Sequence, residues 1–101
     1  MTLCNLDGKR ILLTQANDFM GPSLNAILQA CGATVIADQR DFLDPKAPAQ
    51  AIKEAGELDV LLLNLGVPAP STAASEVEDD EWGLLFRHMV DPLPRFARAA
   101  L

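Results

Sequence analysis

The sequence predicts an α/β fold in which helices flank a parallel sheet. Apolar runs of strand length lie at residues 10–14, 33–37 and 59–63. The segment between the first two runs repeats apolar residues at helical spacing, and a strand, a helix and a strand in this order form the right-handed βαβ unit. The third run is continuously apolar, as in a central parallel strand that is covered on both faces. These observations predict a Rossmann-like sheet, with residues 1–101 forming a partial domain of that type.

The first strand leads into a loop at residues 14–21, and a helix follows from about Pro22. In a parallel-sheet protein a nucleotide pyrophosphate binds here, at the helix N-terminus. Such a loop needs glycines for its tight turn and for the close approach of backbone to phosphate. Only Gly21 of the expected three is present, and Gln15 and Phe19 replace the others. We expect a nucleotide-type fold whose nucleotide site Phe19 partly fills. The alternative is that Phe19 folds back onto the core.

The helix at residues 22–31 ends at Gly32, a favourable stop signal, and the second strand ends in Asp38. In a dinucleotide-binding fold, an acid about 20 residues after the glycine loop accepts hydrogen bonds from the adenosine ribose hydroxyls. An acid that ends a buried strand is also explained by solubility alone. Both interpretations of Asp38 remain open.

The segment at residues 39–58 is short for this kind of fold. It has room for one helix, at residues 45–55, which Pro48 should interrupt early. Residues 40–44 supply at most a short edge segment. A shorter segment leaves fewer residues to line the adenine side of a nucleotide site. This is a second indication against a tightly held dinucleotide.

Asn64 follows the third strand and begins a loop. Ligands of open parallel sheets bind beyond the carboxyl ends of the strands, so one crevice should collect residues 14–19, Asp38 and residues 64–68. The Asn64 side chain has two donor hydrogens and an acceptor oxygen. It is predicted either to tie neighbouring strand-end loops together or to contact a ligand directly.

The last part of the chain predicts a long helix that starts in the acidic run at residues 76–81. Acidic residues are favourable at a helix N-terminus, and no His or Cys is positioned to complete a metal site there. Pro92 and Pro94 should bend or interrupt the helix. His88 lies off the apolar stripe and is predicted to be solvated. The stripe consists of Trp82, Leu85, Phe86, Met89, Leu93, Phe96 and Ala97.

Composition excludes several classes of partner. The formal net charge of −6 argues against nucleic acid and anionic lipid, which both require a basic face. No apolar stretch approaches the roughly 18 residues of a membrane helix, and the first residues lack the charged-then-apolar pattern of a signal peptide. The protein is therefore predicted to be cytoplasmic and without a membrane partner. Cys4 and Cys31 lack the spacing of a metal site, so no metal is expected.

Taken together, these residues resemble the N-terminal part of the short-chain dehydrogenase/reductase superfamily. Residues 6–14 match its opening strand, residues 32–38 its second strand, and residues 56–61 with Asn64 the strand that ends in its Asn-Asn-Ala-Gly motif. The resemblance implies a homo-oligomer, formed through a long interface helix to which Trp82 and Phe86 belong.

The loop is similar to that of one branch, the halohydrin dehalogenases, because Thr14 is followed by four residues, Phe19, one residue and Gly21. These relatives use no cofactor and carry the aromatic residue beside a halide site. The resemblance implies that vicinal haloalcohols are converted to epoxides with release of halide. Thr14 and Gly21 would belong to the motif loop, and Phe19 to the pocket for the small-molecule substrate and the halide.

The alternative that the same resemblance leaves open is an atypical NAD(H)-dependent oxidoreductase acting on a small alcohol or carbonyl substrate. Gly21, Asp38 and Asn64 would then bind the cofactor, and Asp38 would favour NAD over its 2′-phosphorylated form. A non-catalytic module that associates through its helical surface is a third possibility.

No catalytic residue is expected within these 101 residues. The family resemblance implies a Ser, a Tyr and an Arg at the reaction centre, and the chain contains no Tyr. By that mechanism the protein is an enzyme only if its chain continues past Leu101 with the catalytic half.

Overall fold

The computed structural model describes residues 4–101 and contains a three-stranded parallel sheet in the order β2-β1-β3. The central strand pairs with both neighbours, so that Leu12 lies opposite Ile36 on one side and Leu61 on the other. The predicted fold class, a Rossmann-like parallel sheet with flanking helices, is confirmed. The strands are β1 (Arg10–Thr14), β2 (Thr34–Asp38) and β3 (Val60–Leu62).

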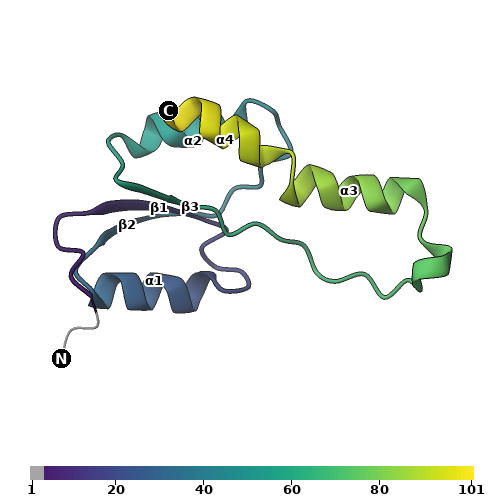
Figure 1. The fold of residues 1–101 in the computed structure, drawn as a ribbon, viewed down its shortest axis with the longest axis horizontal. Coiled ribbons are helices and arrows are strands. Elements are labelled where there is room, and N and C mark those ends of the chain that lie inside the picture. The colour runs from purple at the N-terminus through teal and green to yellow at the C-terminus, as the bar shows by residue number, and fades with distance from the viewer. Residues whose placement is uncertain (1–3) are drawn as a thin grey trace.

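Helices cover both faces of this sheet. Figure 1 shows α1 on one face, α2 and α4 together on the other, and α3 extending to the side at the end of a long loop. A single helix connects β2 to β3, which agrees with the predicted contraction of this region. The helices are α1 (Gly21–Ala30), α2 (Ala47–Ala55), α3 (Asp79–Met89) and α4 (Pro92–Ala100), with a 3₁₀ turn at Ala74–Glu76.

Proline begins helices in this chain. Pro22, Pro48 and Pro92 each lie at the first or second position of a helix, where the missing N–H has no helical acceptor and the fixed φ is already helical. The expectation that Pro48 interrupts its helix is therefore wrong, because α2 starts at Ala47, one residue before it.

The main core lies between the sheet and the pair of helices α2 and α4. Leu12 projects from the central strand into this layer, and the rings of Phe42 and Phe96 meet edge to face with their centroids 4.7 Å apart. Such aromatic pairs add to the stabilisation that burial itself provides. The buried cluster consists of Leu12, Phe42, Ala51, Ala55 and Phe96.

The predicted long C-terminal helix is divided into α3 and α4. Pro92 cannot donate to the preceding turn and its ring clashes with that turn, so the helix breaks at Val90 and Asp91. The break divides the apolar stripe. Phe96 is fully buried in the core, whereas Trp82 on α3 is 56% exposed.

Arg10 connects the sheet to the end of α2. Its guanidinium donates to the backbone oxygens of Ala55 and Glu57, at 2.9 and 2.8 Å, and its backbone N–H donates to the Asp59 carboxylate at 2.8 Å. A cation that caps the carbonyls at a helix C-terminus satisfies otherwise unpaired acceptors. No helix within residues 4–101 is long and apolar enough to cross a membrane.

Candidate functional site

A cleft of about 320 Å³ lies at the carboxyl ends of the strands. Its walls come from the β1–α1 loop, from residues 39–42 after β2 and from residues 65–68 after β3, with His88 of α3 at its edge. This is the position at which open parallel sheets bind ligands. The predicted crevice thus exists, but neither Asp38 nor Asn64 is part of its lining.

The β1–α1 loop has left-handed backbone angles at two non-glycine residues. The φ angle is +43° at Gln15 and +52° at Phe19, the two positions where a dinucleotide loop would carry glycine. Side chains make this conformation unfavourable. Gly21 is required for a different reason, since a Cβ there would lie 2.4 Å from the Ala16 carbonyl oxygen. The loop therefore has the backbone form of a glycine loop with only its last glycine.

Gln15 uses its side chain to pair with the loop after β3. The Gly66 N–H donates to Gln15 Oε1 at 2.8 Å, and Gln15 Nε2 donates to the Gly66 carbonyl at 3.1 Å. A side-chain amide that satisfies both polar groups of one residue acts like the peptide group of a neighbouring strand. It joins two loops that are 51 residues apart in the sequence.

Asn64 strengthens the same junction. Its Nδ2 donates to the carbonyl of Gln15 at 3.0 Å and to that of Asp18 at 2.9 Å. Thr14, which is fully buried, donates through Oγ1 to the Asn64 carbonyl at 2.9 Å. Both donor hydrogens of the Asn64 amide are thereby used inside the protein, which leaves its Oδ1 as the atom available for a ligand.

The Phe19 ring lies against Gly66 on the wall of the cleft. A Cβ added at Gly66 would lie 2.9 Å from ring atom Cε2, so a larger residue there would push the ring aside. The alternative interpretation, in which Phe19 folds back onto the core, is wrong, because the residue is 56% exposed. The ring borders the cleft and leaves it open.

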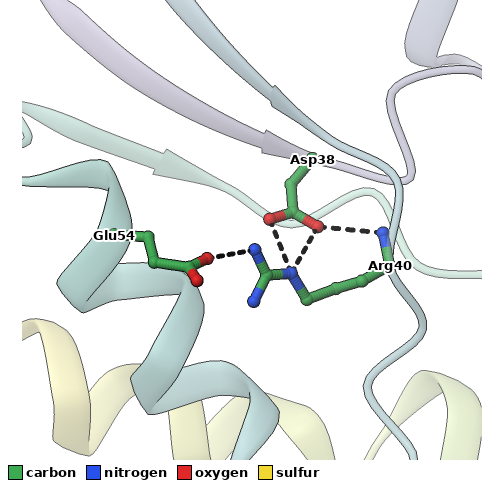
Figure 2. A network of polar contacts seen from close by, with 3 residues as sticks. All are labelled: Asp38, Arg40 and Glu54. Carbon is green, nitrogen blue, oxygen red and sulfur yellow. Dashed lines mark hydrogen bonds and ion pairs between the residues drawn. The ribbon is translucent and has the colours of Figure 1, made fainter.

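Asp38 is held by an arginine two residues further along the chain, as Figure 2 shows. The Arg40 backbone N–H donates to Oδ1 at 2.9 Å, and Nε lies 3.1 Å from Oδ1 and 2.9 Å from Oδ2. Nη2 of Arg40 pairs with Glu54 on α2. The pKa of Arg40 is raised, mainly by the hydrogen bond to Glu54. The Asp38 side chain is only 10% exposed and does not line the cleft, whereas its partner Arg40 does.

A second carboxylate, that of Asp18, lies within the β1–α1 loop itself. It accepts a hydrogen bond from Nε2 of Gln39 at 2.8 Å, and Oε1 of Gln39 accepts one from the Asn17 backbone N–H at 2.7 Å. Gln39 thereby joins the loop to the end of β2. The donors to the Asp18 carboxylate are the neutral side-chain amides of Gln39 and Gln15, and neither cancels its charge. Asp18 therefore contributes a negative charge to the cleft.

Sequence reasoning missed residues 39–42 and His88 at the cleft. His88, predicted to be solvated, is half-buried at its edge, and no local pattern in the helix indicated this. Gln39 and Arg40 follow Asp38 directly, and the spacing of an acid and an arginine two residues apart was the available signal for the ion pair. Across the described part of the chain, no three His, Cys, Asp or Glu side chains gather as a metal site.

No protein-family model and no curated protein matches this sequence. Solved structures do. A short-chain dehydrogenase/reductase from Serratia marcescens BCRC 10948 matches with a TM-score of 0.79 and 23% identity, covering 94% of this chain and 52% of that one. A short-chain dehydrogenase from Mycobacterium smegmatis matches at 0.78 and 22%, covering 99% and 54%. One from Mycobacterium avium matches at 0.71 and 18%, covering 94% and 47%.

These similarities show that the chain has the fold of short-chain dehydrogenases/reductases. At such low sequence identity the similarity shows the fold alone, because one fold can host many functions. The chain spans about half the length of each of these structures.

Proposed function

We propose that this chain is the nucleotide-binding part of an NAD(H)-dependent oxidoreductase that acts on a small alcohol or carbonyl substrate. One observation carries the proposal: an open cleft at the strand ends lies beside a loop that keeps the backbone form of a glycine loop, with positive φ at Gln15 and Phe19. The fold shared with structures named as short-chain dehydrogenases supports it.

The residues present fit part of a dinucleotide. The cleft of about 320 Å³ is at the lower end of the roughly 300–1,000 Å³ usual for ligand pockets, which suits the adenosine portion. Gly21 permits the tight packing at the start of α1, next to the pyrophosphate position. Asp38 and Asn64 lie next to lining residues rather than in the lining itself, and each keeps an acceptor oxygen that a ribose hydroxyl at this edge of the cleft could use. When bound, NAD supplies the hydride that is exchanged with the substrate.

Two features weaken the pyrophosphate position. Asp18 brings a negative charge into the loop, and Pro22 lacks the N–H that the second residue of a helix would otherwise offer to a phosphate. We therefore expect lower affinity for NADH than a loop with its full set of glycines provides.

NADH titration of the full-length protein, followed by cofactor fluorescence, tests the proposal. We expect a dissociation constant in the micromolar range and a clear loss of affinity in Asp38→Ala. The matched control is Asp79→Ala, which removes a carboxylate at the start of α3, far from the carboxyl ends of the strands (Figure 1). Absence of NADH binding to the wild-type protein at millimolar concentration would overturn the proposal.

A second candidate is a cofactor-free dehalogenase that converts vicinal haloalcohols to epoxides and halide. The observation that favours it is the position of Phe19, whose ring lies over Gly66 on the cleft wall in a loop similar to that of halohydrin dehalogenases. A base outside this chain would remove the hydroxyl proton, and the resulting alkoxide would displace the halide.

The variant Phe19→Gly separates the two candidates. It clears the cleft wall and relieves the positive φ, so NADH affinity should be retained or improved under the first proposal. Under the second proposal the same change should lower halide release from a haloalcohol, measured without added cofactor. Halide release that is absent from the wild-type protein rules the second candidate out.

We further propose that the protein self-associates through α3. Trp82 and Phe86 lie edge to face with ring centroids 5.3 Å apart, and both are exposed on this helix. Exposed adjoining aromatic side chains are typical of protein interfaces. Sedimentation of the full-length protein should show an oligomer that Trp82→Ala weakens, and a monomeric wild type would contradict this.

A further inference from the structure

Arg40 places a positively charged side chain on the wall of the cleft. Among the residues described, it is the one lysine or arginine that lines the cleft. Its side chain is 34% exposed, so a ligand in the cleft can reach it. An arginine in such a position normally binds phosphate through two parallel hydrogen bonds. Whether it can do so here depends on which of its nitrogens are already in use.

Two carboxylates of the protein already bind two of the three nitrogens of this guanidinium. Figure 2 shows Asp38 at Nε and Glu54 at Nη2, with no contact drawn to the third nitrogen, Nη1. The three side chains together carry one net negative charge. Asp38 alone would form a neutral pair with Arg40, so the excess negative charge of the group comes from Glu54.

The location of Glu54 has no explanation in the stability of its own helix. It lies in the last turn of α2, where the helix dipole disfavours a negative charge, and its side chain is 53% exposed. Its resolved polar contact is the one to Arg40. Glu54 can therefore influence the cleft only through Arg40, which lines it.

We propose that Glu54 is a positioning residue for cofactor selection: by holding Nη2 of Arg40 it makes the ribose end of the cleft reject a phosphate monoester and accept NAD(H). This inference rests on the proposed NAD(H) function. The 2′-phosphate of the alternative cofactor carries about −1.5 to −2 charges near neutral pH, so the excess negative charge opposes it. Without Glu54, the pair of Asp38 and Arg40 is neutral, and Nη2 is free to donate to that phosphate.

The test is Glu54→Gln in the full-length protein, with NADH and NADPH titrated separately. The ratio of the NADPH to the NADH dissociation constant should fall about tenfold, the size expected for one released charge-assisted hydrogen bond. Affinity for NADH should change little. The double variant with Arg40→Ala should lose the gain in NADPH affinity. Glu57→Gln is the matched control, since it removes the same charge from an exposed residue near by without touching Arg40.

The possible outcomes are separable. An unchanged ratio in Glu54→Gln, with NADH still bound, overturns the inference and leaves the proposed function standing. An equal loss of affinity for both dinucleotides assigns Glu54 a merely structural role and also overturns it. If the wild-type protein binds neither dinucleotide, the proposed function fails and the inference fails with it.

Discussion

The two loops that border the cleft are held by opposite kinds of interaction. The β1–α1 loop is tied to the end of β3 by neutral amide hydrogen bonds from Gln15 and Asn64, in half-buried surroundings. The loop after β2 is held by charges, through a part-buried pair of Arg40 with Asp38 and an exposed pair of Arg40 with Glu54. Each loop supplies a different wall of the same cleft.

The difference indicates a division of roles. Buried neutral networks are costly to disrupt, because a lost partner leaves a polar group without water, and they fix one geometry. Exposed ion pairs contribute little to folding and respond to salt and to bound ions. We therefore expect the amide side to determine the shape of the cleft and the ionic side to determine which ligand charge it accepts.

The largest effect on stability should come from Asn64→Ala. It removes both donors to the carbonyls of Gln15 and Asp18 and should lower the free energy of unfolding by about 2–3 kcal/mol. Urea denaturation measures this. Asn17→Ala in the same loop is the control, because that exposed side chain should contribute less than about 0.5 kcal/mol. If both variants lose the same free energy of unfolding, the hydrogen bonds of Asn64 do not stabilise the loop more than an exposed side chain does.

A smaller loss, about 1–2 kcal/mol, is expected for Gln15→Ala, which removes the paired hydrogen bonds to Gly66 but keeps a side chain at positive φ. Gln15→Gly removes the same bonds and relieves the backbone. It should therefore be more stable than the alanine variant by about 1 kcal/mol. Thermal or urea unfolding of both proteins gives the order, and the reverse order would mean that Gln15 is unstrained.

The smallest change should come from Glu54→Gln. The pair with Arg40 is exposed, so its removal should lower the unfolding free energy by less than about 1 kcal/mol. Repeating the measurement in 1 M salt, where the Debye length is about 3 Å, should abolish the difference from wild type. The loss caused by Asn64→Ala should persist in that salt. A salt-dependent Asn64 effect, or a salt-independent Glu54 effect, would break the contrast between the two loops.

Much of the fold was predictable because its signals are local. The apolar runs gave the three strands within one residue at each end, and the position of the crevice followed from the parallel arrangement alone. Pro92 was expected to bend or interrupt the last helix, and the structure shows an interruption. That Phe96 would enter the core while Trp82 stayed exposed was not predicted, because both share one periodic stripe.

The details of the site were less predictable, because they depend on partners far away in the sequence. Gln15 looked like a substitution that removes a loop glycine, yet its role is set by Gly66, 51 residues later. Its residue type also disfavours the positive φ that the loop retains. Asp38 was considered for ribose binding or solubility, and neither interpretation included the bond that Arg40 forms with it or the contribution of Glu54.

The retained backbone of the β1–α1 loop also bears on how this protein can evolve. Because Gln15 and Phe19 already adopt angles that suit glycine, replacing either by glycine requires no rearrangement of the chain around it. A substitution at either position therefore changes the wall of the cleft while the path of the loop backbone stays the same.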